Sequence, residues 1–406
     1  MNQETKRLTL RYALIHCFFW MGFATIMGFA SVFLLSAGFT NTGVGIVIAA
    51  SGTVSALLQP VVAAVADRGG RWGLRGLTAL MGGGILLLAV AITALSLSGG
   101  APMVIGLLYG SCLLLLQLAL PLVNAIGTEA VNRGQTLNWG AARGVGSVAY
   151  AAVSCLLGIL TRAAGTITVP LLILLSFALL LLSLSLFPLR SREMELSGAR
   201  PAAVSPAVFF RRYPRFGVLL VGTTLLYTGH MILGNFTFQI IQSKGGGSVE
   251  MGMSNAIAAC AELPTMFLFA AMVRRRRCDF WLKLSGLFFT LKALLSWLTP
   301  TVELFYLVQL LQMLGWGLIS VALVYYINAL MDRSDAVKGQ AYATMTFTLG
   351  SVAGSLMGGW LLDLVGAGVV LSAVSAVTLT GALILCAGAE RVAERVPRRP
   401  PTPSAS

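Results

Sequence analysis

Residues 76–97 read GLTALMGGGILLLAVAITALSL and contain no charged side chain. A helix of about 20 apolar residues is long enough to cross the hydrocarbon core of a bilayer, so this stretch predicts a membrane span. Over the whole chain, 57% of the residues are hydrophobic and 10% are charged, whereas soluble proteins are about 25% charged. One water-soluble core could not bury that much apolar surface. The sequence therefore predicts an all-α polytopic membrane protein.

Similar apolar stretches occur on both sides of this segment and give twelve predicted transmembrane helices. They cover residues 10–36, 42–66, 76–97, 102–128, 137–161, 166–187, 216–241, 249–273, 280–298, 302–331, 338–363 and 367–389. The first is too long for a cleaved signal peptide, and small polar residues interrupt it throughout.

The longest polar segment, residues 188–215, separates six predicted spans from the other six. It is rich in proline and predicts a cytoplasmic linker. We expect one six-helix bundle over residues 1–187, a second over 216–389, and a disordered cytoplasmic tail over 390–406. Two parallel six-helix halves are typical of secondary transporters that work by alternating access, with the binding site between the halves near the bilayer midplane.

The basic residues distinguish the two sides of the predicted membrane protein. If the N-terminus is inside, the 28 Lys and Arg lie in cytoplasmic segments, except for Arg162 and Lys244 in outer loops and Arg143 and Lys292 within spans. The positive-inside rule produces such an excess in cytoplasmic loops. We therefore expect a protein of the cytoplasmic membrane with both termini in the cytoplasm and the lipid bilayer as its partner. The net charge of +14 then marks topology and does not indicate nucleic-acid binding.

Other classes of function have little support in the sequence. The six cysteines form no Cys-x-x-Cys pair and have no His at metal-ligand spacing, so we expect neither a metal site nor a disulfide framework. A nucleotide-driven pump would need a GxxxxGK[ST] motif, which the chain lacks. A membrane enzyme would need clustered His, Asp or Glu near one surface, and the two distant histidines and one deep acid of this chain do not form such a cluster. A sensor or scaffold would have no evident use for the charges of Arg143, Glu262 and Lys292 within the spans. We expect no enzymatic activity and no cofactor.

The loop Ala63-Ala-Val-Ala-Asp67-Arg68-Gly69-Gly70-Arg71 is similar to the signature between the second and third helices of the major facilitator superfamily. Ala63 stands where that signature has its first Gly. The glycines permit a tight turn, and the charged residues can pair across the ends of neighbouring helices. The resemblance extends over nearly the whole chain and implies a conformational role for Asp67, Arg68, Gly69 and Arg71.

Within that superfamily, the chain looks most like the lactose-permease (oligosaccharide:proton symporter) group and its phenylpropionate and nucleoside relatives. The segments that carry this resemblance are Gln59-Pro60, Pro121-Leu-Val-Asn124, Gly140-Ala-Ala-Arg143-Gly-Val-Gly146-Ser-Val-Ala-Tyr150 and Ala261-Glu262-Leu-Pro264. The resemblance implies that Arg143 binds the substrate, that Tyr150 lies where the group stacks a tryptophan on the sugar, and that Glu262 is the eighth-helix glutamate.

Four positions depart from the pattern of the permease. Asn124 replaces its sugar-binding glutamate, Gln312 and Gly315 replace a His and a Glu needed for proton coupling, and Lys292 replaces an arginine. The fold therefore carries over well, galactoside specificity carries over poorly, and the proton pathway carries over only in part.

Three charged side chains lie deep in the predicted spans: Arg143, Glu262 and Lys292. A charge near the bilayer centre costs about 2.5–3.5 kcal/mol or more, so such residues usually have a role. Glu262 and Lys292 each lie about three turns from the cytoplasmic ends of adjacent helices, at a depth of roughly 16–18 Å, so an ion pair is geometrically available. The pair could lock the second bundle together. Alternatively, Glu262 could carry a coupling proton with Lys292 as its partner. Glu262 is the only deep carboxylate of the predicted spans, because Asp363 lies near the outer end of its helix.

Several uncharged polar residues are further candidates for the substrate site. Tyr150 lies two turns after Arg143 on the same helix face. Gln117 and Asn124 also share a face, and their alternative role is hydrogen bonding between helices. Gln309, Gln312 and Trp316 form a polar and aromatic stripe. His230 is the better histidine candidate, because His16 lies near the cytoplasmic end of its helix.

The function that we predict from the sequence is proton-coupled uptake of a small polar solute by a transporter that works as a monomer. A sugar or glycoside is the first choice of solute, and an organic acid or a nucleoside is the second. Export by a drug or metabolite:proton antiporter is less favoured, since the fifth span lacks the Pro of the antiporter motif. Sodium could replace the proton, because a single deep carboxylate could serve either ion.

Overall fold

The structure is a computed structural model that describes residues 3–67, 73–132, 134–188 and 206–392. These residues are almost entirely helical, and no strand occurs among them. Nine of their helices are long and apolar enough to cross a membrane, or ten if a bent pair of helices is one span. The chain is thus a multi-pass membrane protein, and the exact number of twelve spans stays a prediction.

The first bundle consists of the helices before residue 189. They are α1 (Gln3–Ile26), α2 (Ala30–Ser36), α3 (Asn41–Asp67), α4 (Leu74–Ser98), α5 (Pro102–Asn132), α6 (Trp139–Ala164) and α7 (Thr168–Ser185). The predicted span 10–36 is divided between α1 and α2, which are bent by 42° relative to each other.

The second bundle follows the predicted linker. Its elements are α8 (Pro206–Arg212), α9 (Pro214–Asn235), α10 (Thr237–Gln242), α11 (Ser248–Val273), α12 (Cys278–Leu298), α13 (Val302–Gln309), the 3-10 turn η2 (Leu310–Met313), α14 (Trp316–Leu330) and α15 (Arg333–Gly388). Pro214 begins α9, a position that tolerates proline because its N–H would be unpaired there.

The second bundle differs from the predicted spans at three places. The span 216–241 is divided between α9 and α10, and the span 302–331 is interrupted by η2 and by Gly315, whose ψ of −93° is not helical. The two last spans form the single element α15, within which Gly366 has a φ of 74°. Glycine populates such positive φ values readily because it has no Cβ.

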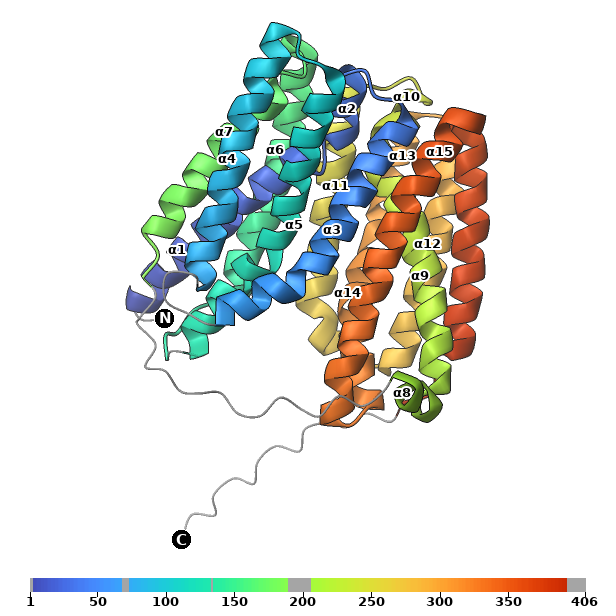
Figure 1. Cartoon of the computed structure of the whole chain (residues 1–406). Helices are drawn as coiled ribbons and strands as arrows, with labels where there is room; N and C mark the ends of the chain where they lie inside the picture. Colours follow the sequence, from blue (N-terminus) through green and yellow to red (C-terminus); the bar gives the residue numbers. More distant parts are fainter. Residues whose placement is uncertain (1–2, 68–72, 133, 189–205, 393–406) are drawn as a thin grey trace.

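The two bundles lie side by side, and α8 and the start of α1 lie at one end of the molecule (Figure 1). We call the opposite end, where α2 and α10 lie, the far end (Figure 1). The bundles contact each other mainly through α3 with α15 and α6 with α11. Glycine makes both contacts close, because a Cβ at Gly45 would overlap the Ser355 carbonyl oxygen and one at Gly252 would overlap that of Ser154.

Small residues also allow close packing inside the second bundle. A Cβ at Gly350 or Gly354 of α15 would lie 2.6 Å from the Cβ of Tyr227 or 2.7 Å from the Thr228 carbonyl oxygen of α9. These glycines therefore let α15 pack closely against α9. Gly83 of α4 is different, because its would-be Cβ has nothing within 4 Å.

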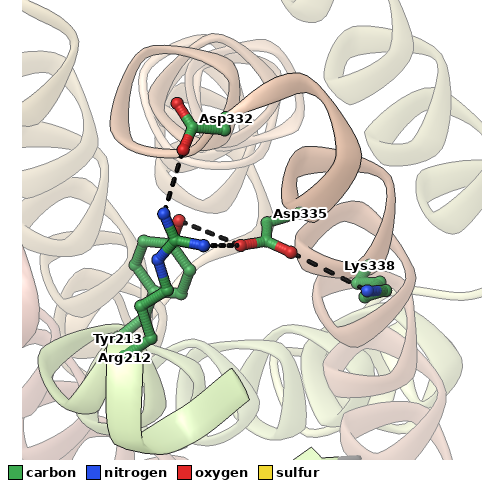
Figure 2. Close-up of polar contacts among 5 residues, drawn as sticks. All are labelled: Arg212, Tyr213, Asp332, Asp335 and Lys338. Atoms are coloured by element: carbon green, nitrogen blue, oxygen red, sulfur yellow. Dashed lines mark hydrogen bonds and ion pairs between the residues drawn. The ribbon is translucent and has the colours of Figure 1, made fainter. Parts of the chain in front are cut away.

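The end of the predicted linker is ordered against the second bundle. Arg212 of α8 donates to Asp332 and to Asp335, each at 3.0 Å, and the Tyr213 hydroxyl donates to Asp335 at 3.2 Å (Figure 2). Lys338 lies 3.7 Å from Asp335 (Figure 2). These ion pairs are partly exposed and contribute about 0.2–1 kcal/mol each, but together they position α8 against the start of α15.

Replacement of Gly222 by Ala should destabilise the second bundle, because the new methyl group would overlap the Leu385 backbone nitrogen. We expect a loss of about 1–3 kcal/mol, measured as a lower Tm of the purified protein in detergent. The matched control is Gly83→Ala, where the methyl group meets nothing and should raise stability by about 0.5–1 kcal/mol. Equal effects of the two changes would contradict the tight packing of α9 against α15.

Candidate functional site

Glu262 of α11 and Lys292 of α12 are connected through Gln312 of η2. Lys292 Nζ donates to Gln312 Oε1 at 2.6 Å, and Gln312 Nε2 donates to Glu262 Oε1 at 2.9 Å. The predicted partners thus lie in one network, but an amide connects them, because it can accept from the ammonium group and donate to the carboxylate at once. Lys292 and Gln312 are buried, with exposed fractions of 7% and 6%.

The interruption between α13 and α14 places Gln312 in this network. The 3-10 turn η2 contains Gln312 and is followed by Gly315 and Gly317. A Cβ at Gly317 would lie 3.4 Å from the Glu262 Cα, so the small residue lets α14 approach the backbone of α11 closely. A break in a helix beside a deep carboxylate is typical of transporter sites.

Arg143 lies on α6, in the other bundle. Its guanidinium lies 4.1 Å from the centre of the Trp20 ring of α1, a cation–π contact. Its Nη1 is buried without a hydrogen-bond partner, and so is Nε1 of Trp20. Arg143 also interacts electrostatically with Glu262 across the two bundles. The site therefore offers two unused N–H donors close to the interface of the bundles.

Trp20 was missed in the sequence analysis, where it resembles any packing residue of an apolar helix. Gly146 was the available signal, since it lies three residues after Arg143 and leaves room for the indole. A Cβ at Gly146 would lie 2.5 Å from Cδ1 of Trp20. Tyr150 also lies beside this indole, at 6.4 Å between ring centroids. The structure thus brings Arg143 and Tyr150 together, as their spacing predicts, around a third residue.

The two polar residues of α5 have separate neighbours. Oδ1 of Asn124 is buried without a partner, and the Asn124 carbonyl oxygen accepts from the Tyr12 hydroxyl at 3.2 Å. Gln117 faces α3, where its Oε1 lies 3.6 Å from the would-be Cβ of Gly52. Asn124 thus adds an unused acceptor to the polar interior, whereas Gln117 lies in a contact between helices. A substrate role for either one stays a prediction.

The predicted stripe on the tenth span is divided by the same interruption. Gln312 joins the Lys292 network, while Trp316 stacks on His230 at 4.8 Å with an angle of 10° between the rings. Phe289 packs edge-on against His230 at 5.5 Å. Gln309 is buried at the end of α13. The predicted residues therefore form a polar network and an aromatic group rather than one continuous stripe.

The signature loop and His16 are the two remaining features singled out from the sequence. Asp67 is the last residue of α3 and is exposed, while Arg68, Gly69 and Arg71 lie outside the described residues. His16 is fully buried next to the Tyr12 ring, at 4.6 Å between centroids, and neither of its ring nitrogens has a partner. The conformational role of the loop therefore stays a prediction.

The arrangement suits recognition of a polar solute and an electrostatic interaction between the two bundles. The described residues contain no group of three His, Cys, Asp or Glu that could hold a metal ion. They bring a deep carboxylate, an ammonium group and a guanidinium within electrostatic reach across the two bundles. The unused donors of Arg143 and Trp20 and the unused acceptor of Asn124 could bind a polar solute.

Comparisons with known proteins concern the family and the fold of the chain. The family model described as MFS_1 like family matches residues 9–373. No sequence among curated proteins matches the chain.

Three solved structures illustrate the fold. The chain is similar to the nucleoside transporter NupG, with a TM-score of 0.76 and 14% identity over 95% of this chain and 99% of that one. A bacterial homologue of the iron transporter ferroportin gives 0.71 and 14% over 96% and 100%. A D-xylose-proton symporter gives 0.65 and 14% over 94% and 97%. At these identities, the likeness shows a common fold.

A double-mutant cycle should detect the amide bridge. Lys292→Leu or Glu262→Leu alone leaves the other buried charge without its partner, so each should lower the free energy of unfolding by about 3–5 kcal/mol. The double variant should lose less than the sum, with a coupling energy of about 1–3 kcal/mol in detergent. The same cycle in a Gln312→Leu background should show little coupling, and undiminished coupling there would contradict the bridge.

Proposed function

The chain belongs to the MFS_1 like family and is a major facilitator transporter, and on that premise we propose that it takes up a small polar solute together with a proton. The observation that carries the proposal is the network of Glu262, Gln312 and Lys292, which lies in one bundle and interacts with Arg143 of the other. A carboxyl group so placed can bind a proton and transmit its charge to both bundles.

The coupling follows from the competition for Arg143. When Glu262 is ionised, it attracts the guanidinium across the interface of the bundles. When Glu262 is protonated, that attraction is lost and the positive charge of Arg143 is left to interact with the solute. Proton binding therefore favours solute binding, and by thermodynamic reciprocity the solute favours the proton. Lys292 opposes protonation through Gln312 and so promotes release of the proton after the solute leaves.

A sugar or glycoside fits the first bundle's side of the site. The rings of Trp20 and Tyr150 could cover the apolar face of a sugar, and the N–H donors of Arg143 and Trp20 could bind its hydroxyls. The names of two structural neighbours give a nucleoside and D-xylose as transported solutes. Both solutes combine hydroxyl groups with a compact ring, which supports this class.

An organic anion is the second candidate, and the charge balance favours it. Arg143 and Lys292 are two deep cations, whereas Glu262 is the single deep acid among the described residues. Buried charges need a counter-charge, and Nη1 of Arg143 has no partner. A carboxylate on the solute would supply both the charge and the acceptor.

We place the transporter in the cytoplasmic membrane with both termini in the cytoplasm, and we propose that it works as a monomer. The distribution of Lys and Arg between the loops supports this orientation. The monomer is sufficient because the proposed site residues come from the two bundles of one chain.

Glu262→Gln should abolish uphill accumulation of the solute and spare exchange, because the amide keeps the hydrogen bonds but cannot carry the proton. The measurement is uptake and counterflow in proteoliposomes, with and without sodium and with a protonophore. Glu303→Gln, at a fully exposed carboxyl group on α13, is the matched control and should keep accumulation. Persistent accumulation in Glu262→Gln would refute the assignment.

A thermal-shift screen of monosaccharides, nucleosides and short carboxylates should identify the solute class. If the solute is a carboxylate, Arg143→Lys should weaken its binding by about tenfold or more, because lysine cannot form two parallel hydrogen bonds to it. Arg162→Lys at an exposed position is the control. A carboxylate that binds equally well to the Arg143 variant would contradict the proposal that Arg143 binds an organic anion, and binding of sugars alone would support the first candidate.

A further inference from the structure

Asp363 joins the two bundles at the far end of the molecule. It lies on α15, and its carboxylate accepts four hydrogen bonds from the first two residues of α3. Oδ1 accepts from the backbone N–H of Asn41 at 3.1 Å and from its Nδ2 at 2.7 Å. Oδ2 accepts from the backbone N–H of Thr42 at 2.7 Å and from its hydroxyl at 2.6 Å. We call these four hydrogen bonds the latch.

The latch satisfies groups that α3 cannot satisfy by itself. The first backbone N–H groups of a helix have no partner within it, and the N-terminus carries a partial positive charge. A carboxylate is the best acceptor for such donors, and hydrogen bonds to it are stronger than those between neutral groups. Because Asp363 comes from the other bundle, this N-terminal cap of α3 is complete only when the bundles are in contact.

The backbones around the latch approach each other closely. A Cβ at Gly359, one turn before Asp363, would overlap the Asn41 carbonyl oxygen. Oδ1 of Asn41 also accepts from Nε2 of Gln239 on α10 at 2.8 Å. The hydroxyl of Ser31 on α2 donates to the Asn235 carbonyl oxygen at the end of α9. These contacts fix the position of α3 against the second bundle and direct both Asn41 and Thr42 toward Asp363.

Asp363 plays no part in the proposed coupling site. In the sequence it appears as an acid near the end of a helix, and its side chain is exposed at the far end rather than buried with Glu262. An exposed acid could simply be solvated. Four matched donors from the opposite bundle indicate instead a specific contact between two bodies that move relative to each other in alternating access.

We propose that Asp363 is the positioning residue that holds the far end closed, and that the latch must break before the solute site opens toward that end. The requirement that the latch break before the solute site opens rests on the proposed transport function, whereas the closing of the far end by Asp363 does not. The latch then biases the equilibrium between closed and open far ends, and its strength sets how much free energy binding of solute and proton must supply.

The test measures the separation of the bundles without any solute. Spin labels are placed at Ser98 and Pro300, which are exposed at the far ends of the first and second bundles, in a background without accessible native cysteines. Distances are measured by double electron–electron resonance in detergent and in nanodiscs. The unsubstituted latch should give one short distance as the main population.

Asp363→Ala should create a longer-distance population and raise the ratio of open to closed molecules by about tenfold, since it removes both carboxylate oxygens and with them all four hydrogen bonds. Asp363→Asn should act in the same direction, because its amide NH2 replaces an oxygen that faces donors. Thr42→Val removes one hydrogen bond at constant size and should give a smaller shift, which keeps the test valid if an Asp363 variant fails to fold. Glu303→Ala removes an exposed acid from the same end and should change nothing.

Unchanged distances in the folded Asp363 and Thr42 variants would overturn the inference, and so would an equal shift in Glu303→Ala. The result is independent of the solute and the ion, so a failure of the latch leaves the coupling role of Glu262 untouched. Conversely, if Glu262→Gln still accumulates solute while Asp363→Ala opens the far end, the coupling proposal fails and the latch stands.

Discussion

The cost of holding a charge inside an apolar bundle determines the interior of this protein. Lys292 and Glu262 meet that cost through Gln312, which satisfies one group with its oxygen and the other with its nitrogen. For Arg143, the cation–π contact with Trp20 and the electrostatic attraction of Glu262 offset the cost of burying the charge. The helix break before α14 and the small residues beside it place Gln312 between Glu262 of α11 and Lys292 of α12.

The two bundles interact at two places, in the interior and at the far end. In the interior, Arg143 and Glu262 interact across the interface, and at the far end Asp363 caps α3 from the opposite bundle. An interior charge and an end contact can act on one transport cycle only if both bias the same two-state equilibrium. The end contact involves long helices of both bundles, because Thr42 lies in the first turn of α3 and Asp363 lies on α15, which packs along α3 and α9.

The sequence pattern predicted which of the deep residues are neighbours. Arg143 and Tyr150 share a helix face and meet around Trp20, and Glu262 and Lys292 share one network. It failed where chain geometry departs from a regular helix. Gln312 and Trp316 would share a face in a continuous helix, but η2 turns them toward different partners. Neither Trp20 nor Asp363 is distinctive by itself, because a tryptophan in an apolar helix and an acid at a helix end are both common.

The sequence by itself determined the class of polytopic membrane proteins, the helical spans and the deep charges. Span length, apolar composition and charge are local properties, and they decide directly whether a segment is stable in lipid. Only the tertiary structure decided which groups meet. Gln312 bridges residues from two other helices, Trp20 lies under an arginine of a distant helix, and Asp363 binds the start of α3. Such contacts join residues far apart in the chain, and their geometry depends on helix breaks and on glycines that set how closely backbones approach.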